Sequence, residues 1–210
     1  DTIIVEPTSG NQGIGLALVG AVKGLKVKII MPDSVSEERR KLVEHYGAEV
    51  ILIHDAGNIG KCIEECLELA LKIKAEDPNV FVPQQFENLA NPEIQREQTG
   101  VEILEQVGKP IHGFCSGIGT GGTITGVGRY LKEQNPNVKI VAVEPHECSV
   151  LSGGFAGKHQ IPGLGAGFKP GNYNPYIVDQ IVRVPSHEAH RAASQLLLCE
   201  GIPAGAASGA

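Results

Sequence analysis

The sequence predicts an α/β protein built around largely parallel β-sheet, and three observations support this fold class. Short β-branched runs alternate with longer segments of helical periodicity along the whole chain. Two of these runs end in glycine-rich loops, at residues 8–13 and 116–123, that lead directly into helical segments. The 210 residues are 41% hydrophobic, which is enough to bury a core. This alternation is typical of βαβ units whose sheet is covered by helices on both faces.

The individual elements follow from the local pattern, taken in chain order. Strands are expected where β-branched residues cluster between turn residues: Ile3–Val5, Val27–Met31, Glu49–Ile53, Val80–Val82, His112–Cys115, Ile140–Val143 and Ile181–Val184. Helices are expected where apolar residues recur at helical spacing: Gln12–Lys23, Ser36–His45, Asn58–Ala75, Pro92–Gln106, Thr123–Glu133 and Ser186–Glu200, with Ser36 and Ser186 as N-caps. The stretch Pro145–Asp179 is rich in Gly and Pro and too long for a simple connection, so we expect it to line a site.

Composition argues against several functional classes. The net charge is −6, and the one basic cluster, Arg39-Arg40-Lys41, follows two glutamates as on a solvated helix face. Five Phe, four Tyr and no Trp offer little surface on which bases could stack. The longest apolar stretch, Ile14–Val22, is too short to span a bilayer. We therefore expect no nucleic-acid or membrane partner.

The five cysteines are odd in number and form no C-x-x-C pair, which favours a reducing compartment over a disulfide framework. Cys62 and Cys66 share a helix face and are expected to be packing residues. His187, His190 and Cys199 lack a matching fourth ligand, so no metal site is predicted.

The first glycine loop has the residues of an anion-binding site. Pro7 ends the expected strand, and Thr8, Ser9, Gly10, Asn11 and Gln12 then place hydroxyls, amides and close backbone at a helix N-terminus. Such a loop suits a small carboxylate or phosphate. The alternative is an ordinary helix N-cap provided by Ser9 or Asn11.

The second glycine loop, residues 116–123, is suited to phosphate. Successive N–H groups without Cβ obstruction, two threonine hydroxyls and a helix N-terminus match a phosphate dianion, and the loop lacks the lysine of a nucleotide P-loop. Gly117, Gly119 and Gly122 also fit the dinucleotide pattern G-x-G-x-x-G, with Glu144 placed as a ribose-binding acid. That alternative leaves the first loop unexplained.

Five ordered motifs carry a family resemblance over essentially the whole chain: residues 6–11 (Glu-Pro-Thr-Ser-Gly-Asn), 84–88 (Gln-Gln-Phe-Glu-Asn), 116–123, 163–168 (Gly-Leu-Gly-Ala-Gly-Phe) and 207–210 (Ala-Ser-Gly-Ala). The chain resembles the cysteine synthases (O-acetylserine sulfhydrylases) of the pyridoxal-phosphate fold-type II family. The resemblance implies two parallel-sheet αβα domains of the tryptophan-synthase-β-like kind, both incomplete. Residues 1–84 would form a partial substrate-loop domain, and residues 85–210 a partial domain that binds the phosphate of pyridoxal 5′-phosphate.

The resemblance also implies site residues, position by position. The cofactor phosphate would be bound by Gly119, Thr120, Gly121, Gly122 and Thr123, its ring hydroxyl by Asn11 and its pyridine nitrogen by Ser208. The substrate carboxylate would be received by the loop residues Thr8, Ser9, Gly10, Asn11 and Gln12 together with Gln85, and Gly163 would line the opposite side. No metal is implied.

The implied reaction is a β-replacement that makes L-cysteine from O-acetylserine and sulfide, with acetate leaving and aminoacrylate as the intermediate. A serine cannot stabilise a pyridinium as an aspartate would, so Ser208 favours elimination over transamination. The resemblance further implies a homodimer and serine acetyltransferase as a partner. A cytoplasmic location is expected, with an organelle as the open alternative.

Departures from the family pattern limit these expectations. The family's Schiff-base lysine lies upstream of the carboxylate loop, so no catalytic residue is assigned here, and we expect a fragment lacking both termini that is inactive alone. Gln12, Leu89 and Ala207 stand where the family usually has Thr, Pro and Ser. Cystathionine β-synthase-type β-replacement, a catalytically silent paralogue that acts as a binding partner, and, less favoured, an NAD-binding dehydrogenase remain as alternatives.

Overall fold

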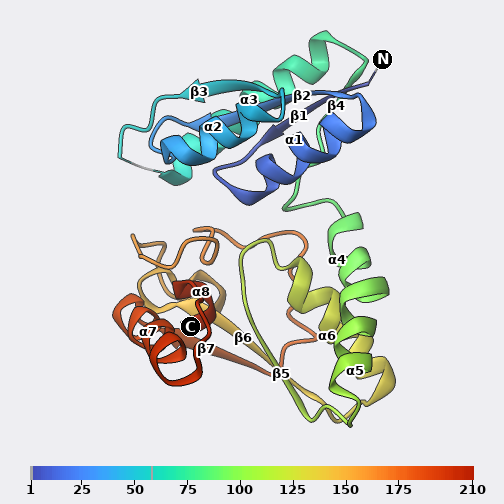
Figure 1. The fold of residues 1–210 in the computed structure, drawn as a ribbon, viewed down its shortest axis with the longest axis vertical. Coiled ribbons are helices and arrows are strands. Elements are labelled where there is room, and N and C mark those ends of the chain that lie inside the picture. The colour runs from blue at the N-terminus through green and yellow to red at the C-terminus, as the bar shows by residue number, and fades with distance from the viewer. Residues whose placement is uncertain (1, 58) are drawn as a thin grey trace. The chain divides into compact units, whose positions relative to one another are not determined.

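The computed structural model describes residues 2–57 and 59–210 and separates into two compact units, Asp1–Gln85 and Phe86–Ala210. Figure 1 shows that each unit has its own sheet and its own helices. All strand pairs in the described residues are parallel, as the alternation of strands and helices predicts. The α/β class is confirmed.

The first unit is a parallel sheet in the order β3-β2-β1-β4. Lys28 Nζ on β2 pairs with Glu49 of β3 at 2.9 Å, across the register that joins these two strands. The elements follow one another as β1 (Ile3–Pro7), α1 (Asn11–Lys23), β2 (Lys26–Pro32), α2 (Glu37–His45), β3 (Glu49–Ile53), α3 (Ile59–Glu76) and β4 (Val80–Phe81).

Alternating side chains of the first sheet supply two separate cores. Ile4 and Ile29 pack with Ala17 of α1 and Val43 of α2 on one face. On the other face Val5, Ile30 and Val80 pack with three buried side chains of α3, which are Cys62, Cys66 and Ala70. Successive strand residues point to opposite faces, so the buried positions of β1 and β2 are apolar on both faces, with Glu6 as the exception. The prediction that Cys62 and Cys66 are packing residues is confirmed.

The second unit is a parallel sheet in the order β5-β6-β7. Its core joins Ile140 and Ala142 of β6 to three residues of α6, which are Ile124, Val127 and Leu131. In Figure 1, α4, α5 and α6 lie to one side of this sheet, and α7 and α8 lie to the other. The elements are α4 (Ala90–Ile94), α5 (Gly100–Val107), β5 (Gly113–Gly117), α6 (Gly122–Gln134), β6 (Lys139–Pro145), β7 (Gln180–Val184), α7 (Ser186–Glu200) and α8 (Ala206–Gly209).

The helix predicted at Pro92–Gln106 contains a wide turn. A π-helical segment, η1 (Gln95–Thr99), separates α4 from α5. Beside it, a Cβ at Gly126 of α6 would collide with the carbonyl oxygen of Pro92 and lie 2.7 Å from Gln95 Cβ. The two helical stretches therefore approach backbone to backbone, at a position where periodicity alone predicts one regular helix.

The predicted N-cap position is confirmed for Ser36 and wrong for Ser186. Ser36 occupies the N-cap of α2 without a side-chain capping bond, and Pro185 occupies that position before α7. The Ser186 hydroxyl instead accepts a hydrogen bond from Gln160 N at 2.9 Å. This long-range contact satisfies the loop backbone, which a local capping rule does not take into account. The predicted start of α3 at Asn58 lies outside the described residues.

The stretch between β6 and β7 is mostly irregular, as expected from its Gly and Pro content. It contains two short 3₁₀ turns, η2 (His146–Cys148) and η3 (Val150–Ser152). Among the described residues, no helix combines the length and apolar character needed to cross a membrane.

Candidate functional site

The first glycine loop leaves the carboxyl end of β1 and begins α1. Gly10 is the N-cap of α1 and makes no side-chain capping bond, so the alternative in which Ser9 or Asn11 caps the helix is wrong. The Thr8 hydroxyl accepts a hydrogen bond from Gly10 N at 3.2 Å and closes a tight turn. Because no side chain of the loop caps the first turn of α1, this helix N-terminus is suited to an anion.

Arg39 adds a positive charge to this loop, a contact that sequence reasoning missed. Its Nη1 donates to the Ser9 carbonyl oxygen at 3.3 Å, and a Cβ at Gly10 would lie 3.5 Å from the same Nη1. Lys41, by contrast, is exposed and pairs with Glu37 at 2.8 Å. The prediction of a solvated helix face therefore holds for Lys41 but not for Arg39, which contacts the first glycine loop. The spacing of Arg39 along α2 carries no indication that it reaches back to a loop thirty residues earlier.

Gln85 lies in the same unit and is connected to β1 by a buried carboxylate. The Glu6 side chain is 0% exposed and accepts hydrogen bonds from Gln84 N at 2.8 Å and Gln85 N at 2.9 Å. Glu6 stands two residues before Thr8, so one strand end carries the loop and the contacts that fix Gln85. Burial raises the pKa of the Glu6 carboxyl above its ordinary value, and the bonds from Gln85 and Gln84 partly offset this.

The second glycine loop leaves β5 and begins α6 with close backbone packing. A Cβ at Gly119 would collide with the Gly163 carbonyl oxygen, which places these two predicted site residues against each other. Gly121 has φ of +79° and forms the N-cap of α6 without a side-chain capping bond. A Cβ at Gly122 would collide with the Asn91 side chain. The glycines therefore let the loop pack closely against neighbouring parts of its own unit, and the loop places the start of α6 at its end.

Asn91 orients one hydroxyl of this loop and is a second residue that sequence reasoning missed. Thr120 Oγ1 accepts hydrogen bonds from Asn91 Nδ2 at 3.0 Å and from Gly122 N at 3.3 Å. A hydroxyl has two acceptor sites and one proton, so Thr120 keeps its proton for a further acceptor. This arrangement favours an anion over a cation at the loop.

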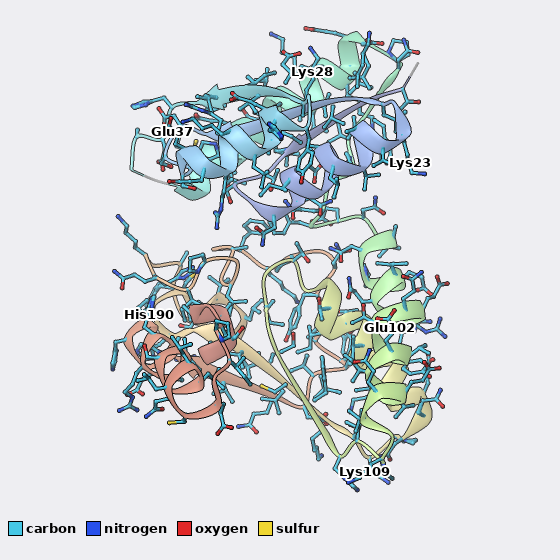
Figure 2. All side chains as sticks on the ribbon, viewed as in Figure 1. Lys23, Lys28, Glu37, Glu102, Lys109 and His190 are labelled. Carbon is cyan, nitrogen blue, oxygen red and sulfur yellow. The ribbon has the colours of Figure 1, made fainter. Side chains whose placement is uncertain are left out.

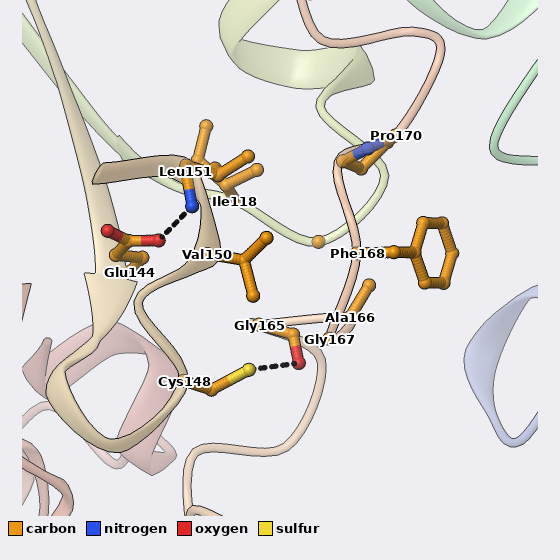
Figure 3. A pocket seen from close by; sticks show the side chains of 11 residues that line it. Ile118, Glu144, Cys148, Val150, Leu151, Gly165, Ala166, Gly167, Phe168 and Pro170 are labelled. Atoms are coloured by element: carbon orange, nitrogen blue, oxygen red, sulfur yellow. Dashed lines mark hydrogen bonds between the residues drawn. The ribbon is translucent and has the colours of Figure 1, made fainter. Parts of the chain in front are cut away.

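The glycine strip Gly163–Phe168 is contacted by two side chains that precede it in the chain. Cys148 Sγ donates to the Gly165 carbonyl oxygen at 3.6 Å, and His159 Nε2 lies 3.1 Å from the same oxygen. Figure 3 shows Cys148 and Glu144 around the small cavity under this strip, which has a volume of about 10 Å³ and room for one water. These contacts fix the backbone of the strip at Gly165. Gly119 lines the same cavity.

The geometry of Glu144 argues against the dinucleotide interpretation. Its side chain is 1% exposed and accepts hydrogen bonds from Leu151 N at 2.9 Å and Ser152 N at 3.1 Å, the first of which is drawn in Figure 3. The Ser152 hydroxyl also donates to it. A ribose-binding acid must present its oxygens to the ligand, whereas this carboxylate is engaged by its own chain.

Ser208 lies on α8, a short helix that packs against α7. A Cβ at Gly209 would collide with the Ala189 carbonyl oxygen, so α8 and α7 meet at backbone distance. Ser208 N donates to the Gly205 carbonyl oxygen at 2.9 Å. Packing on α7 thus fixes the backbone that carries Ser208.

The lysines of the connection from α1 to β2 lie at the opposite edge of the sheet from the first loop, and Lys28 pairs with Glu49. Figure 2 shows Lys23 at the end of α1 and Lys28 on the sheet, and Lys26 is exposed at the start of β2. Among the described residues, no group of three or more His, Cys, Asp or Glu side chains could hold a metal ion.

Two parallel α/β units, each with a glycine loop that presents a helix N-terminus, define a class of proteins that bind small anionic ligands. The family model described as "Pyridoxal-phosphate dependent enzyme" matches residues 1–210. The chain belongs to that family.

Similar proteins support this assignment. A cysteine synthase from Staphylococcus aureus (strain Mu50 / ATCC 700699) is 49% identical over 208 residues, which cover 99% of this chain and 66% of that relative. The crystal structure of a cysteine synthase from Entamoeba histolytica superposes with a TM-score of 0.92 at 39% identity, over 100% of this chain and 61% of that one. A hydrogen sulfide-producing enzyme from Fusobacterium nucleatum gives a TM-score of 0.91 at 40% identity, over 100% and 69%. The chain thus spans about two thirds of the length of these relatives, and the tryptophan-synthase-β-like architecture of both units is confirmed.

The residues present fit the phosphate of pyridoxal phosphate. The 116–123 loop has glycines where a Cβ would collide, an uncapped helix start and a threonine hydroxyl with its proton free to donate. The Thr120 hydroxyl and the N–H groups at the helix start other than Gly122 N, which donates to Thr120, are hydrogen-bond donors of the kind that a dianion requires. Gly119, Thr120, Gly121, Gly122 and Thr123 are therefore the residues that would hold it.

Proposed function

We propose that the protein containing this chain makes L-cysteine from O-acetylserine and sulfide as a pyridoxal-phosphate dependent enzyme. The observation that carries this proposal is the Thr8–Gln12 loop, which combines an uncapped helix start with the Arg39 contact. A loop of this kind suits the α-carboxylate of an amino acid. The 49% identity to a cysteine synthase supports the choice of reaction.

Each unit would contribute a separate function. In the second unit the loop at the start of α6 would hold the phosphate through backbone N–H groups and the Thr120 hydroxyl. In the first unit Thr8, Ser9, Gly10, Asn11 and Gln12 would bind and orient the substrate carboxylate, with Gln85 beside them. Orientation of this kind can lower a reaction barrier substantially, because the reacting bond is held in a productive geometry.

Bound pyridoxal phosphate supplies an electron sink for loss of the α-proton and the acetate group. Asn11 would donate to its ring hydroxyl, and Ser208 would face its pyridine nitrogen. A serine hydroxyl does not stabilise a protonated ring nitrogen as a carboxylate would, so these residues favour β-elimination over transamination. Gly163 would line the opposite wall of the pocket, where the close approach of its carbonyl to Gly119 keeps that wall in place.

The assay that tests this proposal follows L-cysteine formation by the full-length gene product with O-acetylserine and sulfide. We expect turnover with sulfide, and the same preparation with homocysteine as the nucleophile tests the cystathionine β-synthase-type alternative. Gln85→Ala should raise KM for O-acetylserine, whereas Glu102→Gln, on the solvated side of α5, should not. A protein that binds pyridoxal phosphate but consumes no O-acetylserine would support the silent paralogue instead.

We further propose a homodimer and serine acetyltransferase as a partner, both from the family resemblance, and a cytoplasmic location. Light scattering of the full-length protein tests the dimer, and its elution with and without the acetyltransferase tests the partner. Fractionation of the source cells tests the location.

A further inference from the structure

Gln84 has a backbone conformation that L-residues rarely adopt. Its φ is +54°, and it is the one non-glycine residue with positive φ in the part of the chain that the structure describes. A non-glycine residue in this region is strained and persists only where the surroundings enforce the conformation. The residue after it is Gln85, the predicted ligand of the substrate carboxylate. The reason for this conformation therefore bears on how Gln85 is placed.

Glu6 supplies the enforcing contact. Its two carboxylate oxygens accept from two successive backbone N–H groups, Gln84 N at 2.8 Å and Gln85 N at 2.9 Å. Successive N–H groups converge on one anion when the chain passes through a left-handed residue, and the resulting concavity is an anion-binding nest. Here the anion is a side chain of the protein itself. The ladder between β1 and β4 ends at Ile4 and Phe81, so Glu6 holds the chain after regular pairing has stopped.

The two contacts require the ionised carboxylate. A carboxylate accepts at both oxygens, whereas an amide of the same shape accepts at one end and presents a donor to the other N–H. The side chain is fully buried, so water cannot replace a lost contact. An otherwise conservative Glu6→Gln change would thus leave one N–H of the nest facing a donor.

The second unit uses the same device for a different purpose. Glu144 also precedes a proline at the end of a buried strand and accepts from the successive N–H groups of Leu151 and Ser152. There the contact fixes the η3 turn beside the small cavity. The segment Val-Glu-Pro therefore ends a strand in both units. In each, the Glu carboxylate accepts hydrogen bonds from two backbone N–H groups that lie later in the chain. Only in the first unit does the carboxylate hold a predicted substrate ligand, which is Gln85.

We propose that Glu6 is a positioning residue for substrate binding, acting by holding Gln84 in its left-handed conformation and thereby orienting Gln85. This inference rests on the proposed function, because it takes the α-carboxylate of O-acetylserine as the ligand of Gln85. Glu6 also stands two residues before Thr8, so one side chain fixes the spacing between the carboxylate loop and Gln85. Because its carboxylate is buried and accepts from two backbone N–H groups, we assign it no direct contact with the substrate.

The experiment compares Glu6→Gln with Glu44→Gln, which makes the same chemical change on the exposed face of α2, in the full-length holoenzyme. In Glu6→Gln we expect amide exchange at Gln84 and Gln85 to accelerate at least tenfold and KM for O-acetylserine to rise about tenfold, the loss of one charge-assisted contact. The KM for sulfide and kcat should change little, and Glu44→Gln should match the wild type in every measurement.

A second variant tests the route through Gln84. Glycine adopts positive φ without cost, so Gln84→Gly in the Glu6→Gln background should restore part of the lost affinity for O-acetylserine. A folded Glu6→Gln protein with unchanged exchange at Gln84 and Gln85 would overturn the proposal, and so would faster exchange with an unchanged KM. If Glu6→Gln does not fold, Gln84→Gly alone must retain the wild-type KM, and a large rise would overturn the proposal. Absence of cysteine formation in the wild type would count against the proposed function, while the exchange measurement would still report on Glu6.

Discussion

At the residue scale, the carboxyl ends of β2 and β3 carry an ion pair on the edge from which the first glycine loop also leaves. His54 Nδ1 lies 2.8 Å from Asp33 Oδ2, and Asp55 N donates to Asp33 Oδ1 at 2.9 Å. The N–H of Asp55, followed by the His54 ring, lowers the pKa of Asp33 below its ordinary value. The Asp33 carboxylate raises the pKa of His54. The two shifts together define a pH window for this contact.

The pair should contribute most to stability between about pH 4 and pH 6.5. The contribution of His54 to stability is fully present below the ordinary histidine pKa and is lost as pH rises through its raised pKa. The contribution of Asp33 to stability is fully present above the ordinary aspartate pKa and is lost as pH falls through its lowered pKa. An NMR titration should give His54 a midpoint above about 6.5 that Asp33→Asn returns toward that value. Glu76→Gln, at the exposed carboxyl end of α3, should leave the midpoint unchanged, and a His54 midpoint insensitive to Asp33→Asn would contradict the assignment.

Residue types predict the glycine loops but not the side chains that brace them. Thr8–Gln12 and the 116–123 loop follow from local motifs, because hydroxyls and glycines at a helix start are a short-range pattern. Glu6, Arg39 and Asn91 act through contacts with partners 29 to 79 positions away along the chain. Contacts between residues so far apart along the chain follow no fixed sequence separation, so a single sequence does not predict them. Glu6 is informative only in retrospect, as a charged residue inside an otherwise apolar strand.

At the element scale, α1 shows how neighbouring glycines serve different purposes. A Cβ at Gly20 would collide with Val27 Cγ2 of β2, so this glycine lets the helix approach the sheet. A Cβ at Gly15 would meet nothing within 4 Å. Both residues are helical, yet only one is required by packing.

Alanine substitutions should separate the two glycines. Gly20→Ala should lower the free energy of unfolding by about 1–3 kcal/mol, because Val27 is buried and cannot move aside freely. Gly15→Ala should raise it by about 0.5–1 kcal/mol through helix propensity. Urea unfolding of both variants measures the difference. Equal effects at the two positions would show that packing on β2 does not govern this helix.

Most elements are predictable from the sequence because β-branched runs and helical periodicity are strong local patterns. Each of the seven expected strands is present, with ends that shift by a few residues. The wide turn η1 was not predictable, since it depends on how closely α6 approaches through Gly126. The predicted cap at Ser186 is wrong for a similar reason, because its hydroxyl accepts a long-range hydrogen bond from Gln160 N, whereas Ser36 is the N-cap of α2 as predicted.

At the scale of the whole molecule, each unit has its own apolar core. The first unit packs around Ile29 and Ile30 on the two faces of its sheet, and the second around Ile140 and Val127. The predicted phosphate ligands Gly119–Thr123 all lie in the second unit. A ligand that binds only this loop should therefore stabilise the second unit selectively.

Inorganic phosphate tests this expectation without requiring any turnover. At 100 times its dissociation constant, a ligand specific for the folded state adds about 2.7 kcal/mol to the free energy of unfolding. We expect phosphate to slow amide exchange in the first turn of α6 and to leave α3, in the first unit, unchanged. Chloride at equal ionic strength controls for screening.

Thr120→Val should weaken that protection. Valine keeps the shape of threonine but removes the proton left free by Asn91 and Gly122 N, so one donor to the anion is lost. Loss of a hydrogen bond to a charged group corresponds to about 1.5–3 kcal/mol, or roughly a tenfold to hundredfold weaker affinity for phosphate. Equal protection of α6 and α3 by phosphate, or full protection in Thr120→Val, would show that the anion binds elsewhere than the loop at residues 116–123.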